Sequence, residues 1–164
     1  MKRPDRRRRG SAYHEAGHAV ARLHVGAIAT TVEIGTMGGG STHGTPNRWP
    51  SRAPRRMWTW LLVLFAGSYA QAFATRRSVH RVLITSGRLD LREAKPAIDW
   101  LVKRGHASSS LEALARVHID ACWFIALRWP AIERVAGELL RTGRLTGRRV
   151  KVLARQAGKH SNGV

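Results

Sequence analysis

Cysteine, acidic residues and nucleotide-binding motifs are scarce or missing in this sequence. Cys122 is the single cysteine among 164 residues, which excludes an internal disulfide and favours a reducing, cytoplasmic compartment. Ten Asp and Glu compare with 29 Lys and Arg, so the formal net charge is +19. No G-x-x-x-x-G-K-[ST] phosphate loop occurs, and only thirteen residues precede the first candidate catalytic motif. An ATPase domain is therefore not expected.

The excess of positive charge has two interpretations that the sequence leaves open. Residues 1–10 contain six of the basic residues and are expected to form a disordered arm. No apolar run follows at once, so this arm does not resemble a secretory signal. Attraction to nucleic acid, anionic lipid or an acidic partner would explain the charge, as non-specific binding to anionic polymers. Solvated arginine spread through every segment would explain it equally well.

The longest apolar stretch covers residues 58–74 and is too short for a typical membrane span. A helix needs ~20 apolar residues to cross a bilayer, and this stretch also contains Ser68 and Gln71. Its small residues suit close packing between helices. We expect a core helix here, with peripheral membrane association as the less favoured alternative.

The remaining patterns predict a mainly α fold with a small β element. Residues 29–34 are rich in β-branched side chains and predict a strand. A Gly-, Pro- and Ser-rich loop is expected at residues 35–56, with a short return strand near residues 41–44. Pro96 and Pro130 should kink or divide their helices. One domain is expected at residues 11–158, followed by a flexible tail at 159–164. Helices are predicted at residues 11–25 with Ser11 as N-cap, at 55–74 and at 88–102. Further along, the capping box Ser109-x-x-Glu112 opens a helix at 111–128, which Pro130 kinks or follows with a new helix to 143, and Thr146 caps a last helix to 157.

The motif that points to chemistry is His14-Glu15-Ala16-Gly17-His18, an H-E-x-x-H sequence in a predicted helix. Helical residues four apart lie about 40° apart around the axis and ~6 Å apart along it. One Zn²⁺ can therefore bind both imidazoles, with Glu15 beside them as a general base. Apolar Ala19 and Val20 follow, so the helix should be buried. A buried helix does not hold two histidines and a glutamate without partners.

A catalytic zinc site needs a third protein ligand, and spacing alone does not identify it. His24 has the separation found in the metzincin pattern, but Ala21 stands where that pattern needs a glycine to end the helix. A continuing helix would point His24 away from the site. Asp90 and Glu93 are the best placed of the others, at the start of a helix after a turn-like segment. The open candidates are His80, Asp90, Glu93, Asp99, Glu112, His118 and Asp120.

Residues 12–20 resemble the zinc helix of the FtsH family, the peptidase domain of membrane-bound AAA+ metalloproteases. The resemblance extends over residues 11–150, with the later segments in the family's order. Two departures are Gln71, where the family usually has Glu, and Arg149, where it usually has an acidic residue. The similar segments are residues 31–34 (substrate-side strand), 64–72 (A-G-x-x-A-E helix), 85–91 (T-G-A-S-N-D segment), and 129–133 and 145–147 (C-terminal helices).

The resemblance implies an FtsH-peptidase-like multihelical zincin domain without its ATPase. It implies a metalloendopeptidase with Zn²⁺ as cofactor, Asp90 as the third ligand beside His14 and His18, and Glu15 as general base. Flexible or unfolded polypeptides would be the substrates, with a separate ATPase or further copies of the chain as partners. The substrate would lie along the edge of a strand that contains Thr31, Val32, Glu33 and Ile34.

Two other functions stay open on the sequence alone. A non-catalytic basic adaptor or nucleic-acid-associated protein could keep a vestigial zinc site. A membrane-surface protein could use the Trp-rich helix and the Arg-rich arm to dock on anionic lipid.

Overall fold

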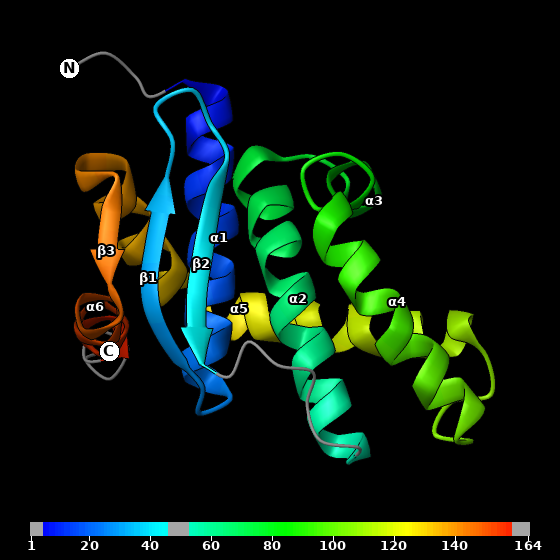
Figure 1. Cartoon of the computed structure of the whole chain (residues 1–164). Coiled ribbons are helices and arrows are strands. Elements are labelled where there is room, and N and C mark those ends of the chain that lie inside the picture. Colours follow the sequence, from blue (N-terminus) through cyan, green and yellow to red (C-terminus); the bar gives the residue numbers. More distant parts are fainter. Residues whose placement is uncertain (1–4, 46–52, 159–164) are drawn as a thin grey trace.

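The computed structural model describes residues 5–45 and 53–158 (Figure 1), which form a mainly helical fold with a small antiparallel sheet. The mainly α prediction with a small β element is confirmed. In chain order the elements are α1 (Arg6–His24), β1 (Ile28–Ile34), β2 (Gly40–Thr45), α2 (Pro54–Thr75), α3 (Val79–Leu83), α4 (Arg88–Lys103), α5 (Ser110–Thr142), β3 (Arg144–Thr146) and α6 (Gly147–Gly158).

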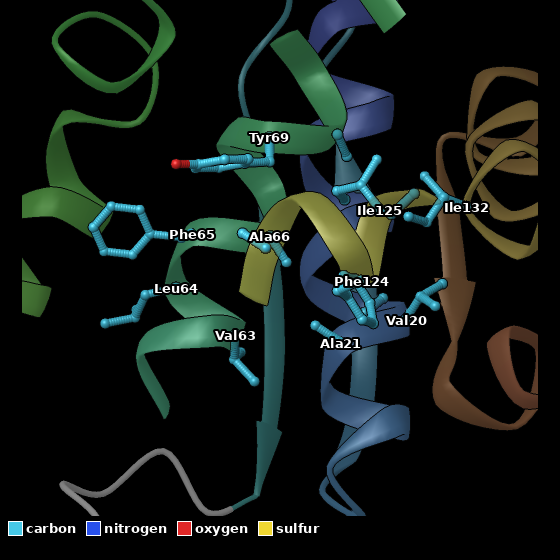
Figure 2. Packing of buried hydrophobic residues seen from close by; sticks show 14 of the residues in the cluster. Val20, Ala21, Val63, Leu64, Phe65, Ala66, Tyr69, Phe124, Ile125 and Ile132 are labelled. Atoms are coloured by element: carbon cyan, nitrogen blue, oxygen red, sulfur yellow. The ribbon is translucent and has the colours of Figure 1, made fainter. Parts of the chain in front are cut away.

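Helix α1 lies in the centre of the fold and packs against α2, α5 and the sheet. Figure 2 shows Val20 and Ala21 of α1 beside Phe124 and Ile125 of α5, and all four side chains are buried. Small residues let α1 and α2 approach closely. A Cβ atom on Gly17 would lie 2.5 Å from the carbonyl oxygen of Ala66, so no larger residue fits there. This packing buries the H-E-x-x-H face of α1 within the protein.

Helix α2 is the predicted core helix, and it is long and apolar enough to cross a membrane by length and composition alone. Within the fold, 61% of its apolar window is buried. The core-helix prediction therefore agrees with its packing against α1 and α5.

The sheet has the order β2-β1-β3, with β1 in the middle (Figure 1). Strand β1 pairs with β2 along its whole length, and its residues 31–33 also pair with residues 144–146 of β3. The prediction that Thr31, Val32, Glu33 and Ile34 offer a free substrate edge is therefore wrong. The cause is β3, which is only three residues long and leaves no pattern in the sequence. Among the described residues, β2 has the free edge on the side of α1 and α2.

Helix α1 begins at Arg6, so the predicted disordered arm is wrong from that residue onward; residues 1–4 lie outside the described residues. The side chain of Asp5 accepts a hydrogen bond from the backbone N–H of Arg7 and caps the helix. Ser11, expected as the cap, lies inside the helix and accepts a hydrogen bond from Gly39 N–H instead. The predicted tail at residues 159–164 and residues 46–52 of the predicted loop also lie outside the described residues, whereas the return strand expected near residues 41–44 is present as β2.

The two helices that contain proline continue through it. Helix α5 has 33 residues and continues past Pro130, and α4 continues past Pro96. Of the two predicted effects, a kink or a division, the division does not occur at either proline. Ser109 caps α5 as predicted, accepting a hydrogen bond from Glu112 N–H. Thr146 caps α6 in the same way, through Arg149 N–H. The short helix α3 and strand β3 were not predicted.

Candidate metal centre

Helix α1 presents His14 and His18 on one face, and both residues are only 8% exposed. The two rings lie 4.7 Å apart between centroids and meet edge to face. Space for His18 comes from Gly67 on α2, where a Cβ atom would lie 2.4 Å from His18 Nε2. The imidazoles are thus held by the packing of α1 on α2.

Asp90, in the first turn of α4, completes a group of three side chains. Its Oδ2 atom lies 3.1 Å from His14 Nε2 and 3.4 Å from His18 Nε2, and the two Nε2 atoms are 3.1 Å apart. A tetrahedral zinc ion with bonds of ~2.0–2.1 Å has ligand atoms about 3.3 Å apart. The three atoms therefore have the separations that one zinc ion requires. They form the single His, Cys, Asp or Glu cluster of this kind among residues 5–45 and 53–158.

Hydrogen bonds on the far side of each ring set the tautomers that a metal needs. His18 Nδ1 lies 2.8 Å from the carbonyl oxygen of Val63, and His14 Nδ1 lies 3.1 Å from Gln71 Oε1. A carbonyl oxygen can only accept, so each Nδ1 carries the hydrogen and donates it. Each Nε2 then has a free lone pair directed at Asp90. Such second-shell acceptors are the usual companions of metal-ligating histidines.

The three inward-facing atoms need a cation between them. Asp90 Oδ2 is buried and has no hydrogen-bond partner among the described residues, because both Nδ1 hydrogens are donated elsewhere. Two nitrogen lone pairs and a carboxylate would repel one another if nothing positive lay between them. The donor set therefore fits zinc, for which neutral imidazole and carboxylate are common ligands.

A proton can take the place of the metal cation. Burial by itself would lower the pKa of His18, but the hydrogen bond and charge of Asp90 outweigh it and raise this pKa to about 9. Burial would raise the pKa of Asp90, but His14 and His18, which donate to its carboxylate once Nε2 is protonated, hold this pKa well below its usual range. Metal and proton therefore compete for the same lone pairs.

Glu15 lies beside the three ligands without being one of them. The residue is 5% exposed, and its Oε2 accepts a hydrogen bond of 2.8 Å from the hydroxyl of Thr42 in β2. A Cβ atom on Gly40 would lie 2.6 Å from Glu15 Cγ, so β2 must pass the carboxylate without a side chain there. This position keeps a carboxylate next to the metal site and oriented by the edge strand.

A pocket of about 440 Å³ opens onto these groups. It is lined by residues of α1, by Gly39 and the first four residues of β2, and by residues of α2 and α4. It contains His14, Glu15, His18 and Asp90 together. A chain segment lying in it would therefore contact the metal ligands, Glu15 and the edge strand at once.

The other candidate ligands do not converge with His14, His18 and Asp90. His24 contacts Arg128 and Phe124, which confirms that α1 continues and carries it away from the site. Asp99 pairs with Lys95, Glu112 bonds Ser108, and His118 accepts from or donates to Tyr69. His80 and Asp120 do not belong to the metal cluster. Glu93 lines the pocket but is not one of the three converging groups.

Sequence reasoning did not assign roles to several residues of the site. Gln71 was noted as a departure from the family pattern, and it is the acceptor that orients His14, while Ser86 donates to the same oxygen at 2.8 Å. Gly67 leaves space for the His18 ring, Thr42 donates a hydrogen bond to Glu15, and Arg22 lines the same pocket. Of these three, only Arg22 could have been found from the sequence, because it continues the four-residue spacing of His14 and His18.

A comparison of the chain with models of known protein families gives no match, and a search of curated proteins gives none either.

Proposed function

We propose that this protein is a zinc metalloendopeptidase that cuts flexible or unfolded polypeptides. The observation that carries this proposal is the convergence of His14 Nε2, His18 Nε2 and Asp90 Oδ2 at separations of 3.1–3.4 Å, with the Glu15 carboxylate beside them. Three protein ligands, an open pocket and an adjacent carboxylate are the parts of a hydrolytic zinc site. A purely structural zinc site would have four protein ligands.

His14, His18 and Asp90 would hold the metal, with Gln71 and Val63 orienting the imidazoles. A zinc ion held there would lower the pKa of a water molecule and polarise the carbonyl of the scissile bond. Glu15 takes the proton from the attacking water and then delivers it to the leaving amine. Thr42, by donating to Glu15 Oε2, holds the carboxylate in place in the pocket.

The substrate would lie extended along β2. It cannot pair with β1, as the sequence predicted, because β1 is the central strand. The free edge of β2 borders the pocket, and residues 39–43 line it. An added strand uses main-chain hydrogen bonds, so it binds many sequences and requires the substrate to be unfolded locally. This explains why flexible segments are the proposed substrates.

The FtsH-like zincin fold is part of the same proposal. Support comes from the H-E-x-x-H helix at the centre, the small sheet beside it, and an aspartate from a later helix at the site. Gln71 supports it too, because its side-chain carbonyl oxygen accepts the hydrogen bond from His14 Nδ1, and a Glu carboxylate at this position could accept the same bond. We propose a cytoplasmic protein that works with a separate ATPase or as a homo-oligomer when substrates must first be unfolded.

The test combines metal analysis with a cleavage assay. Purified protein should contain close to one zinc per chain and should cut a reduced, alkylated protein without ATP. A chelator such as 1,10-phenanthroline should stop cleavage, and added zinc should restore it. Glu15→Gln should keep the zinc and lose ~10²–10⁴ in rate, because only the base is removed. Zinc binding without any cleavage of unfolded protein would contradict the peptidase function.

The net charge of +19 favours one second candidate, a non-catalytic basic adaptor that binds nucleic acid and keeps a vestigial zinc site. Counterion release would make the binding of any anionic polymer weaken steeply with salt and ignore its sequence. Tight binding to one DNA sequence at physiological salt, together with no effect of Glu15→Gln, would favour the adaptor.

A further inference from the structure

A small pocket of about 280 Å³ is formed by the start of α1 and the end of α2, which lie at the same end of the molecule (Figure 1). Arg6 and Arg9 of α1 line it, together with Ala74, Thr75 and Arg76 of α2 and its C-cap. It shares no lining residue with the pocket at the metal centre. Three guanidinium groups around one small cavity repel one another, so the pocket favours an anion.

The three arginines have no acidic partner in the part of the chain that the structure describes, where the ion pairs involve other residues. Asp5, the acidic residue nearest to them in sequence, accepts a hydrogen bond from Arg7 N–H and caps α1 instead. Arg76 is also the one non-glycine residue with a positive φ among the described residues, at 53° in the C-cap of α2. Such strain is common at functional sites.

A row of aromatic rings begins at the same pocket. The guanidinium of Arg9, which lines the pocket, lies 5.7 Å from the ring centroid of Tyr13. Tyr13 stacks on Trp129 of α5, with ring centroids 5.4 Å apart and planes 12° from parallel. Trp129 meets Phe73 edge to face at 4.5 Å. Phe73 immediately precedes Ala74, which lines the pocket. The row therefore returns to the pocket, and the guanidinium groups and rings form one continuous surface.

Phe73 is the ring on this surface that is open to a ligand. The residue is 62% exposed, whereas Tyr13 and Trp129 are half-buried. Proteins that bind single-stranded nucleic acid hold its phosphates in a positively charged groove and stack its bases on aromatic side chains. A phosphate and a base of one nucleotide are covalently joined, so one nucleotide can contact the arginines and Phe73 together.

We propose that Arg6, Arg9, Arg76 and Phe73 form a binding site for single-stranded nucleic acid, with a backbone phosphate between the guanidinium groups and a base on the Phe73 ring. A double strand keeps its bases paired and stacked, so it offers none to Phe73. A membrane surface is broad and flat, whereas these arginines border a small cavity that fits one phosphate group. The site is separate from the metal centre and does not depend on the proposed peptidase function.

Binding is measured first by fluorescence anisotropy at about 0.15 M salt. The probe is a labelled oligo-dT of about 12 nucleotides. Unlabelled duplex DNA of equal length, inorganic polyphosphate and phosphatidylserine vesicles are the competitors. We expect oligo-dT to bind more tightly than each competitor at equal phosphate concentration. Tighter binding of the duplex or the vesicles, or no binding of oligo-dT, would overturn the proposal.

Phe73→Ala tests the stacked base, and Trp123→Ala is its matched control. Trp123 is also an exposed aromatic residue, at 66%, but it does not line the pocket. Phe73→Ala should weaken oligo-dT binding by about tenfold or more, while Phe73→Tyr and Trp123→Ala should bind like the parent. The affinity for polyphosphate should not change in any of the three. Unchanged oligo-dT binding by Phe73→Ala would show that no base stacks there.

Two triple variants test the phosphate contact. Each loses three exposed positive charges, as Arg6→Gln, Arg9→Gln and Arg76→Gln at the pocket, or as Arg148→Gln, Lys151→Gln and Arg155→Gln on α6. Each phosphate contact of a single strand adds ~0.7 to the slope of log affinity against log salt. The pocket variant should therefore lower this slope by about 2, and the α6 variant should leave it nearly unchanged. An equal change in both would reduce the effect to net charge and overturn the site.

Zinc content and Tm show whether each variant is folded. If the pocket triple variant does not fold, Phe73→Ala and Phe73→Tyr decide the outcome, because Phe73 is exposed. Cleavage of unfolded protein is measured in the same variants. Loss of oligo-dT binding with cleavage intact supports a separate site. Loss of cleavage in a folded pocket variant would overturn that separation, and an inactive parent that binds oligo-dT would refute only the peptidase function.

Discussion

Gly67 of α2 lies directly against the ring of His18 of α1, so that a Cβ atom there would come within 2.4 Å of Nε2. That nitrogen is the atom that faces Asp90. The absence of a side chain on one helix thus makes room for the ring of a proposed metal ligand on the next.

We expect Gly67→Ala to reduce zinc binding severely. The new methyl group would lie within 2.4–2.7 Å of three atoms of the His18 ring, so the ring must move away from its present position. Zinc per chain is measured by elemental analysis of purified protein. The matched control is Gly137→Ala in α5, where a Cβ atom meets nothing within 4 Å. That control should keep its zinc and gain roughly 0.5–1 kcal/mol of stability.

Asp90→Ala should lose zinc, while Glu93→Ala should keep it. Both carboxylates lie on α4 one turn apart and both line the pocket, but only Asp90 converges with the two imidazoles. Zinc content is again the measurement. Equal zinc in Asp90→Ala and the parent would show that another group is the third ligand.

Gln71 should affect metal affinity without touching the metal. Gln71→Met removes the acceptor for His14 Nδ1 and should weaken zinc binding by roughly 10–100-fold, the usual effect of losing such a partner. Gln71→Glu restores a stronger acceptor and should bind zinc at least as tightly as the parent. Competition with a colorimetric chelator gives the affinities. If Gln71→Met binds zinc like the parent, the orientation of His14 does not depend on this amide.

Removal of the metal should make stability depend on pH between about 6.5 and 9. The pKa of His18 is raised to about 9 in the folded, metal-free site, compared with about 6.5 in an unfolded chain. The protonated ring therefore stabilises the fold below pH 6.5, and this contribution is lost as the pH rises through about 9. Its size should be on the order of a few kcal/mol.

The measurement is the Tm of chelator-treated protein from pH 6 to 10. Asp90→Asn serves as control, because it removes the charge that raises the pKa of His18. The control should show a much smaller fall in Tm across this range. A flat profile in the chelated parent would show that His18 carries no proton in the folded site.

The local parts of this site could be predicted from the sequence. His14 and His18 share a face because any helix places residues four apart together, whatever packs around it. Ser109 and Thr146 cap their helices through contacts three residues away, which are equally local. Asp90 was more distant, and only the resemblance to a known peptidase family selected it from seven candidates.

Contacts between segments distant in sequence determined which strand has a free edge and which residues surround His14, His18 and Glu15. Strand β1 lost its expected free edge because residues 144–146, more than a hundred positions later, pair with it. Gln71, Gly67 and Thr42 belong to the site because α2 and β2 pack on α1, and no pattern in their own segments records that approach. The helix period determined which side chains α1 presents, whereas close packing between elements determined what they face, since burial joins residues without regard to their distance in sequence.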